Sequence, residues 1–237
     1  MNLPGEIGGD RKATQGAGVL RVWDSPTRAM HWLLVISIAA CWWTGENDEL
    51  EWHQYSGYVA LWVILLRLYW GFVGSSTARF VNFVRGPKTV FKYVRTLHLR
   101  NTPATLGHNA LGAISVLALL TAVLAVVITG LFAVDFDVLY SGPLSSYVDY
   151  RQGRRIARLH GSTLFDILLV VIALHLLAVS FYYFYKRHNL VAAMITGKRK
   201  AEAGTGGELR VAPFWRLVVG VVLASVIVWA VTTGFYF

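Results

Sequence analysis

The sequence predicts an all-α integral membrane protein, in which four helices form a bundle and a fifth transmembrane helix follows at the C-terminus. Three observations favour this class. Hydrophobic residues make up 55% of the 237 residues, whereas charged residues make up only 15%. The mean hydropathy of +0.50 lies above the usual range of soluble domains. The apolar residues gather in long segments, and lone strands cannot satisfy their backbone groups in lipid.

Five segments approach or exceed the roughly 20 residues that a helix needs to cross a bilayer. They cover residues 26–44, 50–73, 108–134, 158–185 and 213–237. The first and the last begin at proline, which suits the first turn of a helix. We expect a flexible cytoplasmic start over residues 1–20 and a basic cytoplasmic linker over residues 189–212. The four-helix bundle would then occupy residues 21–188, and the fifth helix residues 213–237.

The charges of the connecting loops predict the orientation of the helices. Residues 45–52 hold four acidic residues and no lysine or arginine, whereas residues 74–107 hold six basic residues and no acid. Residues 186–212 hold six basic residues against two acids. The positive-inside rule therefore places the N-terminus and the second and fourth loops in the cytoplasm, and the C-terminus outside. The net charge of +9 then reflects orientation and contact with membrane lipid, and we expect no nucleic-acid binding.

Four histidines are the most informative polar residues of the apolar segments. Ionisable groups are costly in lipid and persist mainly where they have a function. His160 and His175 lie fifteen residues apart on one segment, which is about 22 Å along a helix axis. The predicted orientation puts His53 at the depth of His160, near the outer face. It puts His31 at the depth of His175, nearer the cytoplasm.

Two histidine pairs at two depths predict two haem b groups. The iron of haem b takes axial nitrogen ligands from opposite sides, so each haem needs ligands on two facing helices. The pairs His53–His160 and His31–His175 meet this need and leave no open iron position, which favours electron transfer over oxygen binding. Cys41 is the single cysteine, so the sequence offers no C-x-x-C-H site for covalent attachment. Taken singly, each histidine has the alternative of a polar residue satisfied within the bundle.

Three further residues are candidates for contact with the haems. Gly57 lies one turn after His53, where a small residue would admit a macrocycle or simply allow close helix packing. Arg67, near the depth of the inner pair, would bind a haem propionate or extend its charge to the cytoplasmic boundary. Arg28, one turn before His31, has the same two alternatives.

A quinone site is predicted at the cytoplasmic start of the third apolar segment. His108 would exchange protons with a quinone there, and Asn109 would donate a hydrogen bond to its carbonyl. Gly112, in the next turn, is assigned to the same site. The alternative is that Asn109 only caps the helix in an interfacial loop.

Six segments of the sequence surround the candidate residues: V-W-D-S-P-T-R-A-M-H-W (22–32), W-H-Q-Y-S-G (52–57), L-L-R-L-Y-W-G-F-V-G (65–74), G-H-N-A (107–110), R-L-H-G (158–161) and A-L-H (173–175). They resemble the bacterial cytochrome b561 family, which includes the di-haem b-type cytochrome subunit of nickel–iron hydrogenases and, more distantly, that of formate dehydrogenases. The resemblance covers roughly residues 21–188. It implies a bacterial inner membrane protein that holds two haems b in a four-helix bundle, with His31, His53, His160 and His175 at the ligand positions. The fifth segment is a departure from that pattern.

The resemblance implies electron exchange between a partner protein at the outer face and the quinone pool, with quinone near the cytoplasmic haem. The partner would be a c-type cytochrome or an iron–sulfur or hydrogenase subunit, docked on the aromatic-rich external loop 134–157, unless that loop only covers the outer haem. A stand-alone quinone-coupled oxidoreductase such as a superoxide oxidase is an alternative. Four arginines would give it a positive funnel that acids of the same loop weaken: Arg151, Arg154, Arg155 and Arg158. A transporter that uses the histidines as proton relays is a third hypothesis.

Overall fold

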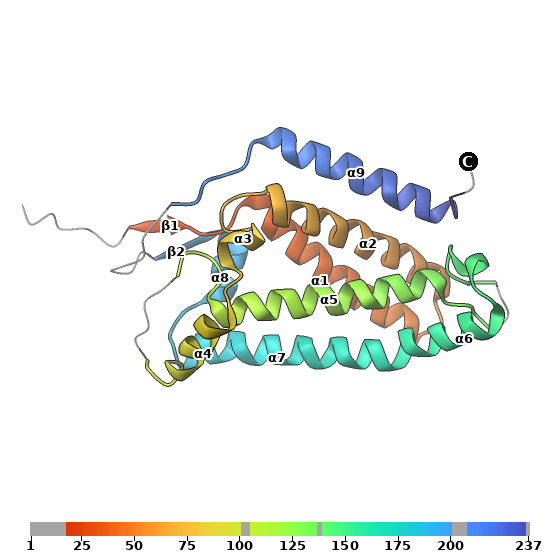
Figure 1. Ribbon diagram of the computed structural model, residues 1–237, viewed down its shortest axis with the longest axis horizontal. Helices are drawn as coiled ribbons and strands as arrows, with labels where there is room; N and C mark the ends of the chain where they lie inside the picture. Colours follow the sequence, from red (N-terminus) through yellow and green to blue (C-terminus); the bar gives the residue numbers. More distant parts are fainter. Residues whose placement is uncertain (1–17, 101–104, 137–138, 201–207, 236–237) are drawn as a thin grey trace, which may run out of the picture.

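Five long helices lie side by side in the computed structural model, which describes residues 18–100, 105–136, 139–200 and 208–235. They are α1 (Ser25–Glu46), α2 (Leu50–Val73), α5 (Ala110–Phe132), α7 (Phe165–Phe184) and α9 (Phe214–Thr232). Figure 1 shows α1, α2, α5 and α7 as a bundle, with α9 along the outer side of α2. The predicted helical membrane bundle with a fifth C-terminal helix is confirmed.

The helix that contains α7 begins outside the bundle. α6 (Tyr150–Arg158) passes into α7 through a π-helical turn, η2 (Leu159–Leu164), and the three together form one helix of 35 residues. At 1.5 Å per residue this helix is about 52 Å long, which exceeds the roughly 30 Å thickness of the hydrocarbon layer. Its first turns lie beside the C-terminal end of α5, where the Val134 amide donates to Gly153 O at 3.3 Å.

Four helices of the described residues are long and apolar enough to cross a membrane: α2, α5, the continuous helix Tyr150–Phe184, and α9. The sequence predicts five spans, and α1 differs because it is long enough, at 22 residues, but less apolar. Two of its polar side chains are buried and satisfied within the helix. Ser37 Oγ donates to Leu33 O and Thr44 Oγ1 donates to Ala40 O, both at 2.7 Å. α1 can therefore pack along α2 without unpaired hydroxyls at these two positions.

Helix α2 is the most enclosed helix of the bundle. Its residues Val63, Ile64 and Trp70 are at most 1% exposed, and α1, α5 and α9 all pack against it. By contrast, Leu174 and Leu177 of α7 are 60% and 66% exposed. Lipid tails are as apolar as leucine, so such exposure is inexpensive on the outside of a membrane bundle.

One buried carboxylate joins the start of α1 to the end of α2. Asp24 is the N-cap of α1, and its Oδ1 accepts a hydrogen bond from the Thr27 amide at 2.9 Å. Its Oδ2 accepts a second bond from Trp70 Nε1 at 3.0 Å. Asp24 is only 1% exposed, so both bonds are shielded from solvent.

The short elements gather at the two ends of the bundle (Figure 1). At the end that holds the starts of α1 and α5 lie α3 (Phe80–Phe83), α4 (Pro87–Arg95), α8 (Leu190–Thr196) and a sheet of β1 (Val19–Arg21) and β2 (Lys198–Lys200). The two strands are antiparallel. At the opposite end lie η1 (Ser145–Tyr147) and α6.

The sheet changes two predicted boundaries. The linker predicted over residues 189–212 contains α8 and β2, and residues 19–20 of the predicted flexible start belong to β1. The physical cause is backbone pairing that hydropathy does not reveal, since the Val22 amide also donates to Gly197 O at 2.8 Å. Residues 1–17 of the predicted start, 201–207 of the linker and the last two residues of the fifth segment lie outside the described residues.

Replacing Asp24 with alanine should destabilise the fold by about 2–4 kcal/mol. An N-cap contributes about 1 kcal/mol, and a buried N–H left unpaired at Trp70 costs about 1–3 kcal/mol more. Asp149 is a matched control, because it also caps a helix, through the Gln152 amide, but has no second buried partner among the described contacts. Unfolding in increasing SDS, followed by circular dichroism, would compare the two variants. Equal losses of stability would contradict the role of the Asp24–Trp70 bond.

Candidate haem sites

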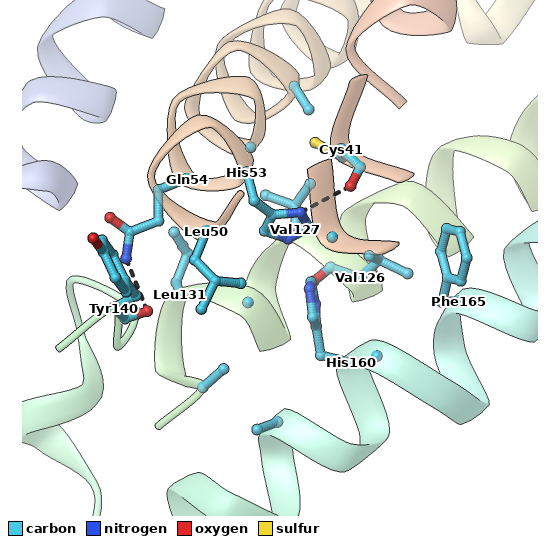
Figure 2. Close-up of a pocket in the computed structure, with 18 of the residues that line it drawn as sticks. Cys41, Leu50, His53, Gln54, Val126, Val127, Leu131, Tyr140, His160 and Phe165 are labelled. Carbon is cyan, nitrogen blue, oxygen red and sulfur yellow. Dashed lines mark hydrogen bonds between the residues drawn. The ribbon is translucent and has the colours of Figure 1, made fainter. Parts of the chain in front are cut away.

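Two imidazoles lie close together near the end of the bundle that holds η1 and α6, which is the end predicted to face outward. His53 lies in the first turn of α2, and His160 lies in the π-helical turn η2. Their ring centroids are 5.8 Å apart and their planes are nearly perpendicular, at 88°. Figure 2 shows the two rings pointing toward one another across a pocket.

The separation of the two rings fits one metal ion between them. With metal–nitrogen bonds of about 2.0–2.1 Å, two imidazoles on opposite sides of an ion have centroids about 6.4 Å apart. The observed 5.8 Å is close to that value. Among the described residues no group of three or more His, Cys, Asp or Glu side chains could hold a metal. A facing pair without further side-chain ligands suits iron whose other four ligands come from a macrocycle.

Backbone carbonyls fix the orientation of both rings. His53 Nδ1 lies 2.9 Å from Cys41 O of α1, and His160 Nδ1 lies 2.9 Å from Val126 O of α5. A carbonyl oxygen only accepts hydrogen bonds, so each Nδ1 carries the proton. The lone pair is then on Nε2, which is the tautomer that a metal ligand needs.

Two glycines give these rings their space. A Cβ atom at Gly130 of α5 would lie 2.9 Å from His160 Cε1, and one at Gly45 of α1 would lie 3.2 Å from His53 Nδ1. The sequence analysis missed both, because a glycine in an apolar helix has many packing roles and nothing in the pattern points to a ring. Gly57, which it did single out, lines the pocket, and a Cβ there would meet nothing within 4 Å. That open space is compatible with the predicted macrocycle.

The pocket between the two histidines has a volume of about 350 Å³ and is mainly apolar. Its apolar walls come from α1, α2, α5 and α7, with Ile38, Val123, Leu131, Phe165 and Leu168 among them. Charged residues line its outer part, namely Glu46, Asp135 and Arg154. The cavity is therefore suited to a large apolar group with a polar edge.

The π-helical turn alters how His160 and His175 are placed relative to each other. Fifteen residues of a regular α-helix leave two side chains about 60° apart around the axis. A π-helical turn holds more residues per turn and takes up part of that angle. Since η2 includes His160 and the four residues after it, both histidines are turned toward the same side of the helix. Hydropathy cannot reveal such a turn.

The inner pair is also brought together. His31 of α1 and His175 of α7 are close enough to interact electrostatically. His175 Nδ1 lies 3.2 Å from Ser115 Oγ of α5, so Nδ1 can donate to the hydroxyl and leave Nε2 as a ligand. His31 Nδ1 is buried without a hydrogen-bond partner among the described residues.

The two arginines have different surroundings. Arg67 is only 7% exposed, and its Nη1 is buried without a partner in the described part of the chain. The guanidinium carbon lies 5.3 Å from the centre of the Phe80 ring, and the charge interacts with His108, which in turn interacts with both inner histidines. The free Nη1 is therefore compatible with the predicted propionate contact. Arg28 instead donates to Ile195 O of α8 and, at 3.2 Å, to Ser25 Oγ. These contacts tie α1 to α8 and give Arg28 a structural role that the sequence analysis did not foresee.

The residues predicted for quinone lie beside the inner pair. Asn109 is the N-cap of α5, since its Oδ1 accepts from the Gly112 amide at 2.8 Å, and its Nδ2 donates to Tyr182 OH at 2.9 Å. The amide oxygen of Asn109 thus caps the helix, as the alternative prediction states, whereas its amide nitrogen binds Tyr182. The His108 ring is 4.6 Å from the Trp23 ring and 4.8 Å from the Phe83 ring. Burial, and next the charge of Arg67, hold the pKa of His108 well below its usual value.

The family model of prokaryotic cytochrome b561 matches residues 22–197. The chain belongs to this family. It is thus a multi-pass bacterial membrane protein that binds haem b and transfers electrons. No curated protein and no solved structure matches the chain significantly. The narrower resemblance to hydrogenase cytochrome subunits stays a prediction, and α9 lies beyond the matched residues.

Replacing Gly130 with alanine should weaken haem binding at the outer histidine pair. The new methyl group would press on His160, and overpacking of this kind costs about 1–3 kcal/mol, or roughly 5- to 150-fold in affinity. Haem content and the spectrum of each b haem would be measured after purification. Gly86→Ala is the matched control, because a Cβ there meets nothing within 4 Å. Full haem content in Gly130→Ala would show that the ring has more freedom than the structure indicates.

Proposed function

We propose that this cytochrome holds two haems b, at His53–His160 and His31–His175, and transfers electrons between an external redox protein and the quinone pool. The observation that carries the proposal is the pair His53 and His160, whose ring centroids are 5.8 Å apart and whose Nδ1 atoms each bind a carbonyl, so that each Nε2 carries the lone pair. His175 lies deeper in the bundle on the same long helix as His160, and its pairing with His31 of α1 supports a second haem. The N-terminus would face the cytoplasm, and the C-terminus the periplasm.

Haem b supplies reversible one-electron chemistry when it is bound. The protein would hold each haem through two histidine nitrogens, which would leave no site on the iron for oxygen. The apolar walls of the outer pocket would exclude water from a bound macrocycle, and Gly57 would leave room for it. Arg67 would neutralise a propionate of the inner haem, which gives its buried Nη1 a partner.

The quinone would bind at the cytoplasmic end, near His108, Asn109 and Gly112. Gly112 supports this place, because a Cβ there would lie 3.3 Å from Asn109 Oδ1 and 3.6 Å from His108 Nδ1. A larger side chain at position 112 would therefore press on Asn109 and His108. Burial keeps the pKa of His108 low and its ring neutral, so it would take up a proton only beside the negative charge of a reduced quinone. Because Asn109 Nδ2 already donates to Tyr182, a quinone carbonyl would have to share or replace that bond.

The external partner would dock on the protruding end of the long helix and the loop before it. Arg151, Arg155 and Arg158 of α6 are exposed and recur at i, i+4 and i+7, so they lie on one face. Phe136 and Tyr147 of the loop are 73% and 57% exposed. Exposed aromatics beside arginines are typical of protein interfaces. A c-type cytochrome or an iron–sulfur or hydrogenase subunit fits this role.

Two haems per chain are expected by pyridine haemochrome analysis. His160→Ala should remove the outer haem and His175→Ala the inner one, because about 22 Å of helix separates the two ligands. His98→Ala, in the exposed loop after α4, is the control and should keep both haems. One haem per wild-type chain, or loss of the same spectral component in both variants, would overturn the proposed ligand pairs.

Substitutions at the two ends should separate the two reactions. Asn109→Ala should slow haem oxidation or reduction by a quinone analogue and leave the reaction with the external partner intact. Replacing Arg151, Arg155 and Arg158 with glutamine should slow the partner reaction, chiefly its association step at low salt. Lys198→Gln with Lys200→Gln removes exposed charges at the cytoplasmic end and should change neither. If the arginine variant lost the quinone reaction and Asn109→Ala kept it, the quinone would react at the outer face.

A second candidate is favoured by Arg154, which lines the outer pocket. A positive group there would attract a small anion such as superoxide, although Glu46 and Asp135 line the same pocket. Two superoxide ions would give up one electron each, leaving two molecules of oxygen, and one quinone would take both electrons and two protons. Purified protein that reduces quinone with superoxide and no partner protein would support this candidate. A strict need for the partner would exclude it.

A further inference from the structure

Helix α4 presents a basic face and an apolar face side by side on the outside of the molecule. Lys88, Lys92 and Arg95 recur at i, i+4 and i+7 and are all exposed. Phe91 and Val94, on the adjacent face, are 58% and 43% exposed. The Arg95 guanidinium lies 4.4 Å from the centre of the Phe91 ring, so the two faces meet at this pair.

The third face of α4 is fixed to the bundle, so the two outer faces cannot turn inward. Tyr93 OH and Tyr182 OH of α7 are 2.6 Å apart. After α4, Lys186 Nζ at the end of α7 donates to Leu99 O. Before it, Phe83 is buried. α4 is thus an ordered nine-residue helix held at three points.

The position of α4 matches its two outer faces. It lies beside the ends of α5 and α7, at the end of the bundle opposite α6 (Figure 1). Residues 74–107 contain six lysines or arginines and no acid, which marks the cytoplasmic side. At this depth an amphipathic helix meets lipid phosphates with its basic face and acyl chains with its apolar face.

We propose that α4 is a binding site for an anionic phospholipid of the cytoplasmic leaflet. The phosphate would pair with Lys88, Lys92 and Arg95. The part of the acyl chains nearest the headgroup would cover Phe91 and Val94. Both faces are needed for this selectivity, because three cations alone would accept inorganic phosphate and an apolar patch alone would accept a zwitterionic lipid. The proposal does not rest on haem binding or on the quinone reaction.

Native mass spectrometry of the intact chain in detergent, titrated with phosphatidylglycerol or phosphatidylcholine, tests the site. Wild-type protein should bind phosphatidylglycerol in preference. Lys88→Gln with Lys92→Gln should weaken that binding about 25-fold, since each basic residue near an anionic surface contributes about a factor of five. Lys198→Gln with Lys200→Gln removes the same charge from the exposed residues of β2 and should bind as the wild type does.

A second variant separates a lipid site from a phosphate site. Phe91→Gln keeps all three cations and should still lose affinity for phosphatidylglycerol, because the acyl contact is gone. Inorganic phosphate at millimolar concentration should not displace the lipid from wild-type protein. Equal binding by the α4 and β2 double variants, no preference over phosphatidylcholine, or displacement by inorganic phosphate would each overturn the proposal.

Discussion

Lipid offers no hydrogen bonds, so each polar group inside this bundle must find its partner in the chain or in a bound molecule. The outer imidazoles satisfy the rule with one nitrogen each, because His53 Nδ1 and His160 Nδ1 use helix carbonyls. Their Nε2 atoms then carry the lone pairs that the predicted haem iron would need. At the inner end, His31 Nδ1 and Arg67 Nη1 are buried without partners among the described residues. At the outer pair, the same constraint fixes the tautomer that a metal ligand needs. At the inner site, a haem propionate would give the buried Nη1 of Arg67 a partner.

This constraint also explains the role of α5, which carries no predicted haem ligand. Val126 O of α5 accepts a hydrogen bond from His160, and the missing side chain of Gly130 leaves room for the His160 ring. Ser115 Oγ of α5 binds His175 Nδ1. Both histidines of the long helix thus depend on α5 for their orientation. The outer end of α1 serves His53 in the same way through Cys41 O. Partners of this kind set the tautomer and basicity of a ligand, so they affect a metal site almost as strongly as the ligands do.

Much of this arrangement follows from the sequence, because hydropathy defines the helices and loop charge defines their direction. Together they put His53 and His160 at one depth, and the structure places their ring centroids 5.8 Å apart; haem ligation itself stays a prediction. What the sequence did not reveal depends on distances of a few ångströms between helices. The close approach of Gly130 to His160, the π-helical turn and the hydrogen bond from Arg28 to α8 are of this kind. Neither composition nor periodicity carries that information.

The fifth helix shows how an addition to the family bundle can leave the haem sites intact. α9 packs on α2, where a Cβ at Gly220 would lie 2.6 Å from Tyr69 and Trp62 Nε1 donates to Ser225 Oγ at 3.0 Å. These are specific contacts, and α9 contributes no residue to the lining of the outer pocket. By covering α2 it encloses the helix that carries both His53 and Arg67. Since those two residues belong to different predicted haem sites, α9 can stabilise both through α2 while the exposed sides of α5 and α7 keep their contact with lipid.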